Sequence, residues 1–404
     1  MSSPSFHPPQ PTTALKGAAW LCVLTMSLHA VLTSSRVAVM LAGLNLGLST
    51  FEVGILVAVF AMLPMMFSVK AGRMIDASGP WKPMYLSSGV VLAGSVIPFI
   101  WLDMISLIAC AILVGIGQMV FQVAALGQLG RGTNEERVKH FSWLPLALSL
   151  SGTVGPLVAG LSIDHLGHRS TFALCALPAI ITLAGLYRIR EQLQSAPRQQ
   201  PQQDTKLKVT DLLEITPLKK VFIANLLIAG AWDTHMFIVP IYGVEIGLSA
   251  TTIGVILSFF GIATLLIRMV LPFIQQRAHP WHFIHASMAA TTIIFVLYPF
   301  TSQVWLLTAL SFALGLALGM TQTSVLSLLQ QHSPAGRASE AFGFRMALIN
   351  GSQVTLPVGF GALGAVFGVM PLFWAAAIAL VSGIWATRDA SRPPSNPTSH
   401  SDPS

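Results

Sequence analysis

Long apolar stretches recur along the whole chain, and short polar segments separate them. Inside each stretch the apolar residues are nearly continuous, without the strict alternation that marks a half-buried strand. A helix of roughly 20 apolar residues crosses the hydrocarbon core of a bilayer, which is about 30 Å thick. Because a spanning backbone must satisfy its own hydrogen bonds, these runs indicate helices. The pattern therefore predicts an all-α membrane protein.

Twelve transmembrane helices are predicted, in two groups of six. Their ranges are 15–40, 51–71, 83–102, 104–127, 142–163, 170–188, 221–243, 251–273, 282–301, 304–329, 342–366 and 370–387. We predict a tail at 1–14, a six-helix half at 15–188, a polar linker at 189–219, a second six-helix half at 220–387 and a tail at 388–404. Both tails are rich in Pro and Ser, so we expect them to be disordered.

The charge distribution supports a membrane protein and gives its orientation. Charged residues make up 9% of the chain and apolar residues 53%, whereas soluble domains carry about 25% charged residues. The net charge of +7 comes from Lys and Arg in alternate short loops, so we predict no nucleic-acid partner. Cytoplasmic loops carry the Lys and Arg excess. We therefore expect a multi-pass plasma (inner) membrane protein with both termini and the linker in the cytoplasm.

The second half of the chain repeats the first. At an offset of 200 residues, matching positions include Gly43, Gly47, Ser49, Gly54 and Phe60 with Gly243, Gly247, Ser249, Gly254 and Phe260. At an offset of 201, Pro156 and Gly160 match Pro357 and Gly361. Parallel repeats of this kind enclose a central site that opens to either side. The repeat predicts two pseudo-symmetric bundles that move a solute by alternating access.

The loop after the second span reads GRMIDASGPWKPM. Its Gly72, Asp76, Gly79 and Lys82 match the signature G-x-x-x-D-x-x-G-x-x-K/R, although Ala77 replaces the usual Arg. The chain therefore resembles the major facilitator superfamily, and the resemblance covers nearly its whole length. It implies that Asp76 bridges the two halves on the cytoplasmic side. Gly72 is also expected to allow close helix packing.

The fifth span carries a second motif. Gly155, Pro156 and Gly160 resemble the G-P-x-x-G-G signature often found in proton-coupled exporters, with Ala159 in place of the first Gly of the pair. A small residue such as Gly160 also lets helices approach closely in lipid. Ala111 in the fourth span stands where the family motif has an Arg, so proton exchange through that Arg is not expected.

Polar residues inside the spans are the candidates for the substrate site, because ionisable groups in hydrocarbon usually face a cavity or pair with one another. The resemblance places spans 1, 4, 7 and 10 around that site. The candidates on these spans are His29, Thr33, Arg36, Gln118, Gln122, Asp233 and Gln322. His29, Thr33 and Arg36 form one stripe of the first span by their spacing, and the two Gln of the fourth span share a face. For the three Gln, hydrogen bonding between helices is an equal alternative to substrate contact.

Asp233 and His235 are two residues apart, about 200° around a helix, so they cannot both face one cavity. We assign Asp233 to the site because the repeat maps it onto Thr33, and we interpret His235 as a packed, hydrogen-bonded histidine. We expect Arg36 and Asp233 to form an ion pair when the protein faces inward, because a pair lowers the cost of each buried charge. Arg268, near one end of the eighth span, is interpreted as a side chain that reaches to the membrane surface.

The favoured function is secondary transport of a small organic solute, coupled to protons, with export ahead of import. Arg36 leaves import of an organic anion open, and a solute sensor derived from a transporter is a further alternative. The two symmetric halves make a channel less suitable. The chain has no recognisable catalytic motif, so we do not expect an enzyme. No metal-binding spacing is present among the three cysteines, Cys22, Cys110 and Cys175, so we expect no metal site. We also expect no cofactor, and we expect the protein to be a monomer.

Overall fold

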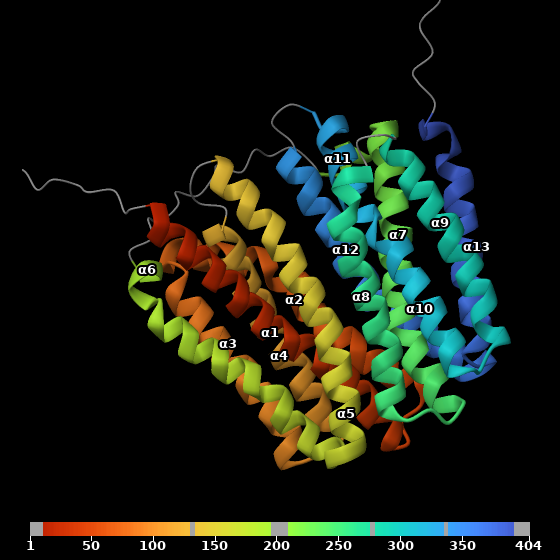
Figure 1. Cartoon of the computed structure of the whole chain (residues 1–404), viewed down its shortest axis with the longest axis horizontal. Helices are drawn as coiled ribbons and strands as arrows, with labels where there is room; N and C mark the ends of the chain where they lie inside the picture. Colours follow the sequence, from red (N-terminus) through yellow and green to blue (C-terminus); the bar gives the residue numbers. More distant parts are fainter. Residues whose placement is uncertain (1–10, 130–133, 195–208, 275–278, 335–337, 392–404) are drawn as a thin grey trace, which may run out of the picture.

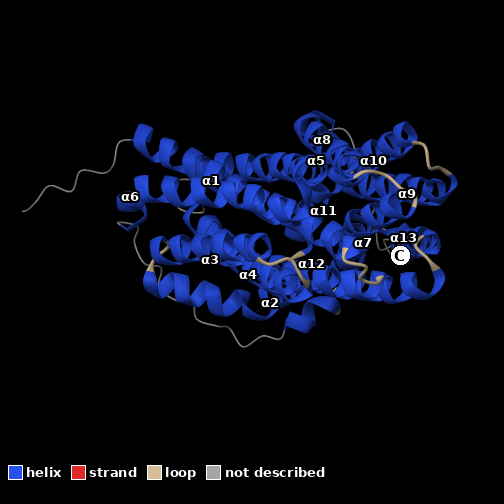
Figure 2. Ribbon diagram, turned by 90° about the horizontal axis from the view of Figure 1, so that it is seen from below, coloured by secondary structure: helices blue, strands red, loops and turns tan. Residues whose placement is uncertain are grey.

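The chain folds into long helices that run side by side (Figure 1), and Figure 2 shows helix from one end of the molecule to the other. The computed structural model describes residues 11–129, 134–194, 209–274, 279–334 and 338–391. In these ranges there is no strand. The all-α prediction is confirmed.

Helices α1 to α6 form the first half. Their bounds are α1 Pro11–Asn45, α2 Thr50–Ser78, α3 Trp81–Ile100, α4 Met104–Leu129, α5 Asn134–Arg188 and α6 Arg190–Gln194. Helix α5 holds two spans, because Gly167 interrupts it with a φ of 80°. Only a residue without a Cβ adopts this conformation readily, so the chain reverses there and crosses again.

Helices α7 to α13 form the second half. Their bounds are α7 Thr216–Glu245, α8 Ala250–Ile274, α9 Pro280–Leu297, α10 Val304–Gly319, α11 Thr321–His332, α12 Ala338–Phe367 and α13 Met370–Thr387. In the described ranges, three short 3₁₀ turns accompany them: η1 Val209–Leu213, η3 Tyr298–Phe300 and η4 Arg388–Ser391. The tenth span, predicted as one helix, is interrupted at Met320 and consists of α10 and α11.

Ten helices in the described ranges are long and apolar enough to cross a membrane. One of them, Trp143–Arg188, bends at Gly167 and makes two crossings. Helix α12, with 30 residues, supplies the remaining one. The arrangement therefore agrees with twelve spans.

The first turn of each half has the same geometry. Gly47 and Gly247 have φ values of 79° and 78°. Ser49 and Ser249 follow, and the hydroxyl of each accepts a hydrogen bond from the backbone N–H three residues further on. Such a hydroxyl satisfies one of the unpaired N–H groups at a helix start. The two halves thus begin their second helices in the same way, as the repeat predicts.

The halves meet along two helix pairs, α2 with α12 and α5 with α8. A Cβ added at Gly54 would lie within 3.0 Å of the carbonyl oxygen of Pro357, and one at Gly254 would lie as close to that of Pro156. These two contacts are equivalent under the repeat. Glycine is required at both because backbone touches backbone.

One end of the bundle is closed by a hydrophobic seal, which we define as residues 37–43 of α1 and 237–243 of α7. Every residue in both segments is buried. A single hydrophobic cluster joins the seal of α7 to side chains of the first half. Among the described residues, these side chains come only from within 37–57 and 159–163. Towards the opposite end, Met62, Met65 and Met66 of α2 are exposed. The halves therefore close at the end of the bundle where α1 and α7 finish.

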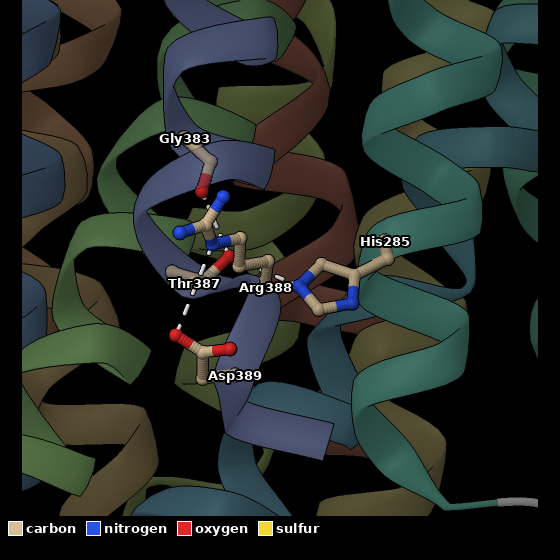
Figure 3. A network of polar contacts seen from close by, with 5 residues as sticks. All are labelled: His285, Gly383, Thr387, Arg388 and Asp389. Carbon is tan, nitrogen blue, oxygen red and sulfur yellow. Dashed lines mark hydrogen bonds and ion pairs between the residues drawn. The ribbon is translucent and has the colours of Figure 1, made fainter. Parts of the chain in front are cut away.

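A polar network fixes the last turn of α13 against α9 (Figure 3). The buried Thr387 hydroxyl donates to the carbonyl of Gly383 at 2.8 Å and lies 3.0 Å from Nε2 of His285. Because a hydroxyl has one proton, Nε2 of His285 is the donor in the second bond. The neighbouring pair of Arg388 and Asp389, at 3.9 Å, is exposed and adds little stability.

Candidate functional site

The polar stripe of α1 lies against α5. Nδ1 of His29 is 2.6 Å from the Ser151 hydroxyl, and the Thr33 hydroxyl donates to the carbonyl of Ser151 at 3.0 Å. Gly155 allows this approach, because a Cβ there would overlap the Thr33 hydroxyl. His29, Thr33 and Arg36 are all partly exposed in the middle of the helix. The predicted stripe is therefore present, and Ser151 is a partner that the sequence did not reveal.

The second half holds the equivalent contact on α7 and α12. The Ser352 hydroxyl donates to the carboxylate of Asp233 at 3.2 Å. Asp233 corresponds to Thr33 (33 + 200), and Ser352 corresponds to Ser151 (151 + 201). Each half therefore ties its first helix to its fifth through a serine at the same depth. Asp233 itself is only 6% exposed.

Arg36 has no hydrogen-bond acceptor in the described part of the chain, and no carboxylate there lies within 4.0 Å of it. Asp233 is near enough to interact with its charge, but the two side chains do not form the expected ion pair in this conformation. Asp233 instead contacts Ser352. An unpaired guanidinium inside a span is costly, so Arg36 requires water or an anionic solute as its partner.

His235 is fully buried and lies in the packed interior of the second half. Its Nε2 is 3.1 Å from the hydroxyl of Ser311, and its ring stacks on Phe260 with centroids 4.6 Å apart. The interpretation of His235 as a packed histidine is confirmed. Asp233 is then the ionisable residue in the middle of α7 that stays a candidate for the site.

The three glutamines have different surroundings. Gln118 is 2% exposed, and neither atom of its amide has a partner among the described residues. Gln122 is partly exposed. Gln322 accepts a hydrogen bond from Arg268 at 2.6 Å. A buried amide without a partner costs free energy, so Gln118 requires water or solute to satisfy it.

Arg268 does not reach to the membrane surface, and that interpretation was wrong. One of its terminal nitrogens donates to the carbonyl of Pro145 at 3.2 Å and to the hydroxyl of Ser149 at 2.5 Å. The other donates to Gln322. The side chain therefore joins α5 of the first half to α11 of the second. Arg268 lies six residues before the end of α8. At that distance its long side chain can extend either to the membrane surface or into the bundle, and the sequence does not distinguish the two.

The loop motif lies at the end of α2. Gly79 has a φ of 79° and ends the helix, while Lys82 is exposed. A Cβ at Gly72 would meet nothing within 4 Å, so the expected close packing at this residue is wrong. The side chain of Asp76 lies outside the described part of the structure.

The motif of the fifth span lies on the seal side of the interface with α8. A Cβ at Gly160 would overlap the carbonyl oxygen of Ala250, so close packing is confirmed here. One turn further, the carboxylate of Asp164 accepts hydrogen bonds from the backbone N–H groups of Ala250 and Thr251, at 3.2 and 2.7 Å. Asp164 therefore caps α8 from the other half of the molecule. Nothing in the sequence pattern indicated this contact.

The comparison with known families agrees with the twelve-span, two-half architecture. The sequence profile of the Major Facilitator Superfamily matches residues 19–354 and, in a second alignment, 221–403. The chain belongs to the Major Facilitator Superfamily. Its membership establishes a multi-pass membrane transporter and not an enzyme.

This superfamily member is similar to proteins named multidrug resistance protein MdtG. It is 26% identical to the one from Salmonella arizonae over 304 residues, which cover 70% of this chain and 75% of the relative. It is also 26% identical to the one from Salmonella typhi, over 65% of this chain and 70% of the relative.

Solved structures of peptide transporters share the fold. A POT family transporter in complex with a thioalcohol-conjugated peptide has a TM-score of 0.77 at 12% identity, covering 93% of this chain and 96% of that one. A POT family transporter in complex with 5-aminolevulinic acid gives the same values. At this identity the likeness concerns the fold of the superfamily member and not its substrate.

Proposed function

We propose that this protein exports small organic solutes across the plasma membrane in exchange for protons, as a monomer. The relatives named for multidrug resistance support the export direction. The G-P motif of α5 supports it as well, since Gly155 and Gly160 lie at the contacts with α1 and α8.

The observation that carries the proposal is the position of Arg36 and Asp233 beside the seal. Arg36 directly precedes the buried segment 37–43, and Asp233 lies one turn before 237–243. When the seal opens, both groups become accessible from the other side. The solute would leave Arg36 on that side, a proton would bind Asp233 there, and the return rocking motion would carry the proton inward.

The test is flux in proteoliposomes. Purified protein is reconstituted and offered organic anions, lipophilic cations and neutral compounds, with and without an imposed pH gradient. Proton-driven export predicts flux of at least one compound that increases when protons flow in the opposite direction. Flux in the same direction as protons would instead support an importer, and binding without turnover would support a sensor.

Asp233→Asn should remove the stimulation by the pH gradient while leaving the protein folded. The amide keeps an acceptor for Ser352 but cannot exchange a proton. The measurement is initial flux with and without the gradient. Asp389→Asn, at an exposed position on η4, is the matched control and should behave as wild type. An unchanged response of Asp233→Asn to the gradient would remove Asp233 from the coupling mechanism.

Cysteine labelling tests the orientation. Cys22, Cys110 and Cys175 are buried, so the background reactivity is low. Asn45→Cys, at the exposed turn beside the seal, should react with an impermeant reagent applied from outside, whereas Lys219→Cys at the start of α7 should react only after permeabilisation. The reverse pattern would place both termini outside.

A further inference from the structure

We propose that Arg268, Ser149 and Gln322 form a binding subsite for an oxyanion group, such as a carboxylate or phosphate, on the transported solute. The site lies between α5, α8 and α11. This assignment rests on the proposed function, because it names the chemical class that the transporter carries.

The balance of charge inside the bundle favours an anion. Away from the span ends, the largely buried charged side chains of the described residues are Arg36, Arg268, Arg345 and Asp233. None of the three arginines has a carboxylate within 4.0 Å in that part of the chain. Arg345 instead donates to the amide oxygen of Asn225 at 2.8 Å. Uncompensated cations inside a membrane are costly, and a bound anion lowers that cost.

The guanidinium of Arg268 has N–H groups that are available to bind such a ligand. A guanidinium has five N–H donors. Three of them donate to Pro145, Ser149 and Gln322, which leaves two without an acceptor in the described structure. All three acceptors are neutral, so they orient the side chain without neutralising it. The side chain is partly exposed. A planar guanidinium with free N–H groups suits a carboxylate or phosphate.

The helix backbone is interrupted next to Gln322. The tenth span breaks at Met320, and α11 begins at Thr321, next to Gln322. Interrupted spans are a common feature of transporter binding sites. The first half lacks an equivalent, since α4 is continuous and the repeat partner of Arg268 is Ser68. The site therefore departs from the pseudo-symmetry where most of the fold keeps it.

The subsite touches both halves of the protein. Ser149 belongs to α5 of the first half, whereas Arg268 and Gln322 belong to the second. An anion that binds here contacts groups whose separation changes as the halves rock. Binding at this position can thus favour one conformation over the other, which substrate recognition in alternating access requires.

The experiment measures the thermal stability of the purified full-length protein with inorganic phosphate, sulfate or acetate, against chloride at equal ionic strength. Arg268→Gln removes the charge. Gln322→Glu keeps the shape and places a carboxylate against Arg268, so it folds with an internal counter-charge. Lys219→Gln, which removes an exposed cation, is the control. The same variants are assayed for flux of organic anions and of neutral compounds.

We expect at least one oxyanion to raise the melting temperature of wild type and of Lys219→Gln. Arg268→Gln and Gln322→Glu should bind that oxyanion at least about tenfold more weakly, because each loses a charge-assisted hydrogen bond to it. Equal stabilisation of wild type and both variants overturns the subsite, as does no stabilisation of wild type by any oxyanion. Flux of neutral compounds that persists in either case leaves the transport function standing. Oxyanion binding without any flux would leave the subsite standing and remove the transport function.

Discussion

Gly160→Ala should nearly abolish transport, while Gly152→Ala on the same helix should retain it. The added methyl at Gly160 overlaps the backbone carbonyl of Ala250, which cannot move aside as a side chain would. Overpacking of this kind costs about 1–3 kcal/mol, and the cost falls only on the conformation in which the seal is closed. The equilibrium should therefore shift by roughly 5- to 150-fold towards an open seal.

The measurement combines flux with accessibility of Met40→Cys, a buried position inside the seal. In the Gly160→Ala background, a thiol reagent from the seal side should modify Met40→Cys faster than in the parent. Gly152→Ala places its methyl where nothing lies within 4 Å, so its rate should not change. Normal flux and normal modification in Gly160→Ala would show that this contact does not control closure.

Asp164→Ala should also open the seal, by loss of the cap that joins the halves. The carboxylate accepts two hydrogen bonds from the first turn of α8. Removing a helix cap costs about 1 kcal/mol, or about a fivefold change in the equilibrium. Because the cap comes from the other half, this free energy stabilises the closed seal as well as the helix. The modification rate of Met40→Cys should rise about fivefold.

Glu52→Ala is the matched control for Asp164→Ala. Glu52 accepts from the backbone N–H of Ser49 at 2.8 Å and completes a cap within α2, at the same end of the bundle. Its loss weakens one helix start without separating the halves. Equal modification rates in the two variants would mean that Asp164 acts only as a helix cap. Asp164→Asn retains an acceptor and should lie between Asp164→Ala and wild type.

The sequence predicted the fold well because its signals are local or repeated. A span is recognised from its own apolar residues. The matching Gly and Pro positions indicated the repeat, which the equivalent contacts of Gly54 with Pro357 and of Gly254 with Pro156 share. The arrangement of the helices around the central site then follows from the resemblance to the superfamily.

The site was predicted only in part, because helical spacing gives the face of a residue but not its partner. The stripe of His29, Thr33 and Arg36 is found as expected, yet Ser151 came from another helix. The ion pair between Arg36 and Asp233 is not formed in this conformation, since its geometry depends on the tilt of two helices. Arg268 was interpreted wrongly for the same reason.

The matching contacts of Gly54 on Pro357 and Gly254 on Pro156 have a consequence for the origin of the chain. The surface of the first half that carries Gly54 and Pro156 contacts the equivalent surface of the second half, which carries Gly254 and Pro357. A two-fold symmetric dimer makes the same kind of contact, called isologous. A single six-helix ancestor would therefore have paired with a second copy of itself through these glycines. Asp164 has no such counterpart, because Ala365 occupies the equivalent position, 164 + 201. Its contact with α8 therefore marks a position at which the two copies have diverged since duplication.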